Sequence, residues 1–281
     1  MIPQSFEYAA PKTLNEALAL IAKGAKPLAG GMSLIPMMKL RLAAPESLVD
    51  LGRIPDLSTI REEQGALHIG ATVTHDEVES SPAVRGKCPL LAETAAHIGD
   101  PQVRNKGTIG GSVAHADPSA DYPAALQALE ATIVTSKSRH ISVADFFVDT
   151  FTTSLEPGEL IVKVVVPLES SGTGTSYQKM VQPASGFAIV GVAVRIAKSG
   201  GKISMARIGV TGLSNCSYRA TAGEKALEGT AGGAAEIKAA AELAADVADA
   251  NSDLHASANY RRHLATVYAA RAITAALART A

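Results

Sequence analysis

The order of apolar and polar positions divides the chain into three parts, and the first spans residues 1–56. Apolar side chains at positions 14, 18 and 21 share one face of a helix, with Thr13 placed as its N-cap. Short apolar runs at 26–29 and 47–51 fit buried strands, and 33–42 fits a second helix. The pattern predicts a small α/β unit.

A larger unit is expected over residues 57–175, where short strands and helices are mixed. Alternation at 66–71 fits a half-buried strand, and the run at 160–166, closed by Pro167, is the strongest strand signal in the chain. Helices are expected at 74–78, 90–98 and 122–129, and further strands at 132–135 and 140–143.

The third part, residues 176–281, begins after a Ser- and Gly-rich connector at 170–176, which marks a domain boundary. Strands followed by helices favour an antiparallel sheet with helices on one face, so the whole chain is expected to be α+β. The strands are expected at 176–181, 188–197 and 202–211, with a hairpin turn at 198–202, and the helices at 220–227, 234–250 and 257–279.

Composition narrows the class of protein. The formal net charge is −1 and only 19% of residues are charged, which excludes a general nucleic-acid binder. Two isolated cysteines, Cys88 and Cys216, exclude an iron–sulfur cluster or a Cys-rich zinc site held by this chain alone. No apolar run reaches membrane-spanning length, and the N-terminus lacks a signal-peptide pattern. We expect a soluble, cytoplasmic protein.

Two glycine segments carry the candidate chemistry: the first glycine segment at 28–33 and the second glycine segment at 108–112. Adjacent glycines let a ligand approach the backbone, and consecutive free N–H groups bind anions. Two such segments favour a ligand with two distant polar parts, such as a dinucleotide, although each alone also fits an ordinary tight turn. Neither matches a Rossmann or P-loop motif. Asp117 and Asp121 nearby need polar partners, which a ribose or a ring edge would supply.

The remaining polar residues point to no catalytic group. His97 and His115 are interpreted as structural, and the spacing of His68 and His75 fits no metal site. Arg261, like its neighbour at 262, is expected on the exposed face of the last helix. No catalytic triad can be assembled, so neither a catalytic residue nor a metal ligand is assigned.

With these residues in view, the chain resembles the FAD-binding medium subunit of molybdenum hydroxylases, the xanthine dehydrogenase and carbon monoxide dehydrogenase family. The resemblance implies a vanillyl-alcohol-oxidase (PCMH) type FAD-binding fold with subdomains 1–56 and 57–175, then a sheet-and-helix domain at 176–281. The matching segments are LAGGMSLIPMMKLRL at 28–42, LVDL at 48–51, IGATVTHDEV at 69–78, IGDPQVRNKGTIGGSVAHADPSADYPAAL at 98–126 and YRRHLATV at 260–267.

The resemblance also implies residue roles. Backbone N–H groups of both glycine segments would hold the FAD pyrophosphate, and Asp121 would hydrogen-bond the cofactor. Lys179 would contact its polar edge, and Phe187 would lie over or beside the isoalloxazine. The family's charged residues after Lys179 are missing from the segment 181–187, VQPASGF. The full expected set is Leu28, Ala29, Gly30, Gly31, Met32, Ser33, Leu34, Ile98, Thr108, Ile109, Gly110, Gly111, Ser112, Asp121, Ile161, Lys179 and Phe187.

By the same resemblance the chain is an electron-transfer flavoprotein subunit. A large subunit would hold the molybdenum cofactor and a small one two [2Fe–2S] clusters, in a dimer of heterotrimers. Electrons would leave through FAD to NAD⁺, a quinone or O₂. The alternatives are a free-standing FAD oxidase or reductase and a cofactor-free scaffold subunit. The substrate stays open among carbon monoxide, a purine, an N-heterocycle and an aldehyde.

Overall fold

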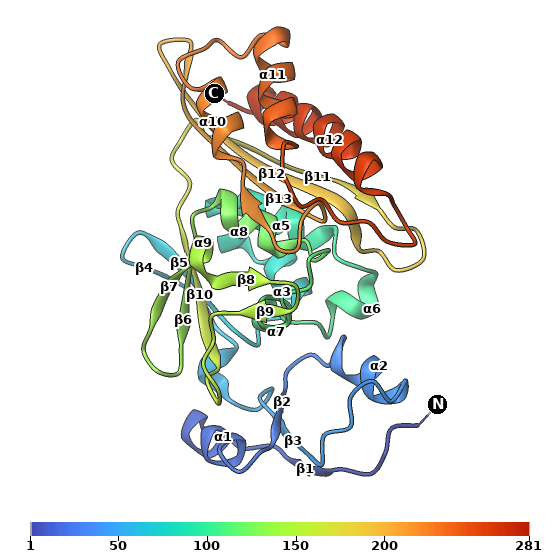
Figure 1. The fold of residues 1–281 in the computed structure, drawn as a ribbon. Coiled ribbons are helices and arrows are strands. Elements are labelled where there is room, and N and C mark those ends of the chain that lie inside the picture. The colour runs from blue at the N-terminus through green and yellow to red at the C-terminus, as the bar shows by residue number, and fades with distance from the viewer. Residues whose placement is uncertain (1, 281) are drawn as a thin grey trace.

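The structure, a computed structural model, describes residues 2–280, and its three larger sheets are stacked along its long axis (Figure 1). The first sheet is parallel and joins β1 (Glu7–Ala9), β3 (Ser47–Asp50) and β2 (Lys26–Leu28), in that order. Helix α1 (Leu14–Ile21) begins at Thr13, whose hydroxyl accepts the N–H of Glu16, and α2 (Leu34–Lys39) follows β2. The predicted α/β unit is therefore present.

The middle sheet is antiparallel, and its central strand arrives last in the chain. β10 (Ile161–Pro167) lies between β5 (Ala66–Gly70) and β6 (Thr132–Thr135). The edges are β4 (Ile60–Glu63) and β7 (His140–Ser142). Because β10 is paired on both sides, its continuous Val-rich run is the one that the sequence marks most strongly.

Short helices fill the chain between β5 and β6. Prolines at 82 and 89 each begin a new helix, so the helical pattern of 74–98 forms three helices rather than the two that were expected. Outside this stretch, η1 (Pro55–Leu57) precedes β4, and the small hairpin of β8 (Phe147–Asp149) and β9 (Thr152–Thr153) precedes β10. The helices between β5 and β6 are α3 (His75–Ser80), α4 (Pro82–Lys87), α5 (Pro89–Ala96), α6 (Pro101–Arg104), α7 (Ile109–His115) and α8 (Tyr122–Ala128), and α9 (Val143–Phe146) follows β7.

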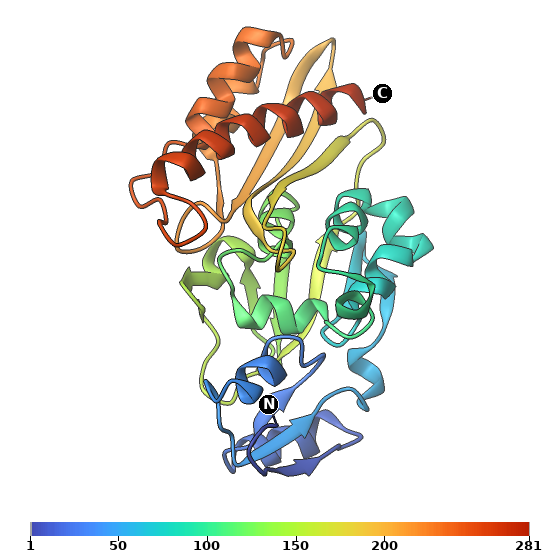
Figure 2. The ribbon, with the colours of Figure 1, turned by 90° about the vertical axis from the view of Figure 1, so that its right-hand side faces the viewer.

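The C-terminal sheet has the order β11 (Gly174–Val181), β12 (Ala188–Ser199), β13 (Lys202–Thr211) and β14 (Tyr218–Arg219), all antiparallel. Helices α10 (Thr221–Leu227), α11 (Ala234–Ala244) and α12 (Ala258–Ala278) follow it, and α12 crosses one face of the sheet (Figure 2). The other face packs on α8 and α5 of the middle unit. A Cβ added to Gly209 on β13 would lie 1.9 Å from the carbonyl oxygen of Ala124, so only glycine permits this approach.

Two expectations for this domain are wrong. Helix α11 ends at Ala244 rather than at 250. Arg261 is buried, with 3% of its surface exposed, and its guanidinium donates to the carbonyls of Ile189 and Gly212 and pairs with Asp253. Those carbonyls lie where β12 begins and just after β13 ends, and a long cation from α12 reaches them across the sheet.

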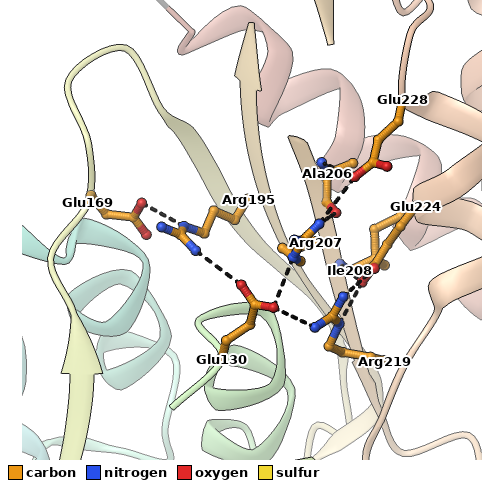
Figure 3. Close-up of polar contacts among 9 residues, drawn as sticks. All are labelled: Glu130, Glu169, Arg195, Ala206, Arg207, Ile208, Arg219, Glu224 and Glu228. Atoms are coloured by element: carbon orange, nitrogen blue, oxygen red, sulfur yellow. Dashed lines mark hydrogen bonds and ion pairs between the residues drawn. The ribbon is translucent and has the colours of Figure 1, made fainter. Parts of the chain in front are cut away.

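An ion network joins the middle unit to the C-terminal sheet (Figure 3). Glu130, which follows α8 with φ +53°, accepts from Arg219 at 2.7 Å and lies 3.1 Å from Arg207. Arg195 on β12 pairs at 2.7 Å with Glu169, which lies just before the connector. These contacts fix the sheet against the end of α8. Within residues 2–280 no helix is long and apolar enough to cross a membrane.

Candidate functional site

A cavity of about 560 Å³ opens between the N-terminal unit, the middle unit and one loop of the C-terminal domain. Such a volume is typical of small-molecule sites, which span about 300–1,000 Å³. Both glycine segments line it, so the fold brings together two stretches that are about 80 positions apart in the chain. The other walls include residues 98–99, 160–161 and 185–187.

The first glycine segment provides free backbone donors. β2 ends at Leu28, Gly31 has φ +74°, and α2 begins without a side-chain cap on its first turn. Within residues 2–280 the N–H groups of Met32, Ser33 and Leu34 have no protein acceptor, and all three residues line the cavity. Consecutive unpaired N–H groups at a helix start attract an anion. This geometry fits a phosphate-bearing ligand.

The second glycine segment is the start of helix α7 rather than a turn, and its donors are already used. Thr108 caps the helix through the N–H of Gly111 at 3.1 Å. The N–H of Ile109 donates to Val73, that of Gly110 to Ala71 and that of Ser112 to Thr108. The expected backbone contacts from this segment to a pyrophosphate therefore have no free donor at 109–112.

The glycines of the two segments have different roles. A Cβ added to Gly30 would lie 2.0 Å from the carbonyl oxygen of Lys106, and one added to Gly110 would lie 2.5 Å from the Cβ of Ala71. These two residues let protein segments approach one another. A Cβ at Gly111 would meet only the hydroxyl of Thr108, at 2.8 Å, and the Cβ of Ala29, at 3.7 Å. Gly111 is therefore the glycine whose missing side chain leaves space in the cavity.

Asp121 lines the cavity, but its carboxylate already has protein partners. It is 4% exposed, accepts from the hydroxyl of Tyr177 at 2.5 Å, and receives the ammonium of Lys179 at 2.9 and 3.1 Å. Burial raises the pKa of Asp121, and the cation and the hydroxyl oppose that shift. The hydrogen-bond partners that Asp121 was expected to find in a ligand are therefore supplied by the protein itself.

Lys179 lies behind the cavity wall and not on it. Its ammonium donates to the carbonyls of His97 and Gly186, both at 2.7 Å, as well as to Asp121, which uses its three N–H bonds. The expected contact between Lys179 and a cofactor edge is not formed from this position.

Two histidines that were given no ligand role line the cavity. His75 begins α3, is 4% exposed, and its Nδ1 lies 3.3 Å from the hydroxyl of Tyr122. Burial, with a smaller effect of Arg104, lowers the pKa of His75 to about 4, so the ring is neutral at neutral pH. The half-buried His115 packs on Phe151, and burial lowers its pKa as well. The position of His75, directly after a strand and its turn, was the signal in the sequence that could have indicated a place at the cavity.

Fifteen of the seventeen expected residues line the cavity, the exceptions being Lys179 and Ile109, which is fully buried in the core. Phe187 is 41% exposed at the cavity, and Ile98 and Ile161 supply apolar walls. Among residues 2–280 no group of three or more His, Cys, Asp or Glu is placed to hold a metal ion. The lining residues that the sequence did not single out include Ala71, Thr72, Gly99, Val103, Gly107, Ala114, Ala120, Leu160, Ser185 and Gly186.

Comparison with known proteins agrees with this geometry. Residues 4–169 match the family described as the FAD binding domain in molybdopterin dehydrogenase, and residues 175–276 match the CO dehydrogenase flavoprotein C-terminal domain. The chain is 43% identical to the carbon monoxide dehydrogenase medium chain of Hydrogenophaga pseudoflava, over 100% of both chains. It is 38% identical to the 6-hydroxypseudooxynicotine dehydrogenase complex subunit alpha of Paenarthrobacter nicotinovorans, over 99% of this chain and 97% of that one.

A solved structure extends the likeness to three dimensions. It is that of carbon monoxide dehydrogenase from Hydrogenophaga pseudoflava lacking the Mo-pyranopterin moiety of the molybdenum cofactor, with a TM-score of 0.97, 44% identity and full coverage of both chains. The α+β fold class and the FAD-binding assignment are thereby confirmed. The chain belongs to the family of FAD-binding medium subunits of molybdenum hydroxylases and is an oxidoreductase component.

Proposed function

We propose that this chain carries FAD in the cavity and passes electrons from a small iron–sulfur subunit to an external acceptor. The observation that supports this most is the row of free N–H groups at Met32, Ser33 and Leu34, which line a cavity that also has apolar and aromatic walls at Ile98 and Phe187. A ligand that carries both phosphates and an aromatic ring, such as a flavin dinucleotide, fits this combination of walls.

The protein's part is to hold and surround the cofactor. Free donors of 32–34 bind the pyrophosphate, and the hydroxyl of Ser112 and the missing side chain of Gly111 complete that wall. Ile98, Ile161 and Phe187 pack around the isoalloxazine and exclude water. Bound FAD supplies reversible redox chemistry, and the neutral ring of His75 adds no charge to its surroundings.

The remaining redox centres belong to other chains. Each [2Fe–2S] cluster takes four protein ligands, usually cysteines, and this chain has only two cysteines, Cys88 and Cys216, both of them free thiols. We place two clusters on the small subunit and the molybdenum cofactor on the large one, in a dimer of heterotrimers. Free thiols are typical of a reducing compartment, which supports a cytoplasmic location.

Substrate choice lies with the large subunit. The two relatives named above are subunits of a carbon monoxide dehydrogenase and of a 6-hydroxypseudooxynicotine dehydrogenase, at 43% and 38% identity to this chain. Similar medium subunits therefore occur in complexes with unlike substrates. We propose that this chain supplies the step that such complexes share, the transfer of electrons to an external acceptor.

Purification of the native complex tests the proposal. A flavin absorption spectrum, one FAD per copy of this chain and two co-purifying subunits are expected. Assays would use carbon monoxide, a purine, an N-heterocycle and an aldehyde with NAD⁺, a quinone or O₂. Bound FAD without companion chains would favour a free-standing oxidase, and a chain that takes up no FAD in the complex would refute the proposal.

A further inference from the structure

The side chain of Lys179 is 1% exposed, yet it carries a charge that no cavity ligand reaches. A buried ammonium is stable only when each of its N–H bonds has an acceptor. Here the three acceptors are the carbonyl of His97, the carbonyl of Gly186 and the carboxylate of Asp121. The position of each acceptor is therefore tied to that of the ammonium.

These acceptors come from three separate segments. His97 ends α5 and Asp121 precedes α8, so both belong to the middle unit. Gly186 belongs to the loop 182–187 between β11 and β12 of the C-terminal domain. One buried cation thus links a loop of the C-terminal domain to two points on the middle unit.

The loop 182–187 is itself compact. The side-chain oxygen of Gln182 accepts the N–H groups of Ala184 and Ser185, at 2.6 and 2.8 Å. Gly186 has φ +75°, and a Cβ added there would lie 3.1 Å from the Cα of Gly99. A compact loop moves as a unit, so holding the carbonyl of Gly186 also holds its neighbour Phe187.

We propose that Lys179 is a positioning residue: its ammonium holds the loop 182–187 against the middle unit, and so sets the place of the Phe187 ring at the cavity. The proposal rests on the proposed function only in that the cavity holds FAD. Phe187 is 41% exposed and lines the cavity, so its position sets how far an external acceptor reaches the flavin edge.

A fluorescent reporter tests the loop without FAD. The chain contains no tryptophan, so Phe187→Trp gives it a single indole at the position in question. We would compare this variant with one that also carries Lys179→Met and Asp121→Asn, which removes both charges and avoids a lone buried carboxylate. Loss of the link is expected to shift the emission to longer wavelength and to raise the acrylamide quenching constant.

A second buried ion pair provides the matched control. Arg195 on β12 and Glu169 lie 2.7 Å apart, with side chains 11% and 7% exposed (Figure 3). Neither residue belongs to the loop 182–187 or lines the cavity. Arg195→Met with Glu169→Gln in the reporter chain should leave emission and quenching unchanged. Equal quenching in the Lys179 and Arg195 variants, both folded by circular dichroism, would overturn the proposal.

The loaded complex supplies the functional readout. Removal of the Lys179 link should alter the KM for the acceptor and the rate of reoxidation by O₂ more than it alters the rate of flavin reduction by substrate. If the tryptophan signal changes but the acceptor kinetics do not, the proposal that the loop controls access of the acceptor to the flavin is wrong. If the wild-type complex holds no FAD, the proposed function fails, and the tryptophan signal still decides whether Lys179 positions the loop.

Discussion

Gly111→Ala tests whether the space beside Gly111 is occupied by the ligand rather than by another segment of the protein. The added methyl would lie 2.8 Å from the hydroxyl of Thr108 and 3.7 Å from the Cβ of Ala29, with no backbone atom within 4 Å outside its own helix and chain neighbours. Both neighbours line the cavity. The substitution therefore takes space from the ligand without forcing the backbone to move.

The expected magnitudes follow from general energetics. Replacing glycine by alanine inside a helix gains about 0.5–1 kcal/mol. Weakening the Thr108 cap costs about 0.5–2 kcal/mol, so the free energy of unfolding should change by only about 1 kcal/mol. Overfilling a packed site costs about 1–3 kcal/mol, which lowers FAD affinity roughly 5- to 150-fold.

Gly110→Ala is the matched control one residue away. Its Cβ would lie 2.5 Å from the Cβ of Ala71 and 2.6 Å from the carbonyl oxygen of the same residue, which is backbone of the middle unit. This variant should lose stability and lose FAD only in proportion to unfolding. The assays are FAD titration of the deflavinated complex and urea unfolding. Unchanged FAD affinity in a folded Gly111→Ala complex would show that this wall is not at the cofactor.

Three further predictions concern stability, each measured by urea unfolding of the full chain. The folded pKa of His75, about 4, lies below its unfolded value, so the unfolded state binds more protons between pH 4 and about 6.5. The free energy of unfolding should therefore fall by up to about 3 kcal/mol as the pH drops through that window. His75→Gln should make the free energy of unfolding less dependent on pH there. Arg261→Met leaves buried carbonyls unpaired and should cost about 2–5 kcal/mol, whereas Arg271→Met on the exposed side of the same helix should cost under about 1 kcal/mol; equal losses would contradict the burial argument. Glu130→Gln weakens the network of Figure 3 and should cost about 1 kcal/mol, less at high salt; a salt-independent loss would exclude an ionic origin.

Local pattern predicted most elements because burial and dihedral preferences repeat at short range. The strand at 202–211 and the capping position of Thr13 follow from neighbours within a few residues. Helix α11 ended early because its last expected turns, 245–250, lie in a loop whose contacts are with other segments, such as that from Arg262 to the carbonyl of Val247.

The sequence by itself determined the α+β class, the two glycine segments and, through its motifs, the FAD-binding family. The tertiary structure decided which groups are free to act. The N–H groups of 32–34 are open while those of 109–112 are used, because the start of α7 docks on Ala71 and Val73. Asp121 and Lys179, 58 positions apart, satisfy one another instead of a ligand. Spacing along a chain encodes local geometry, but the acceptor that each buried donor finds depends on which distant segments the fold brings together.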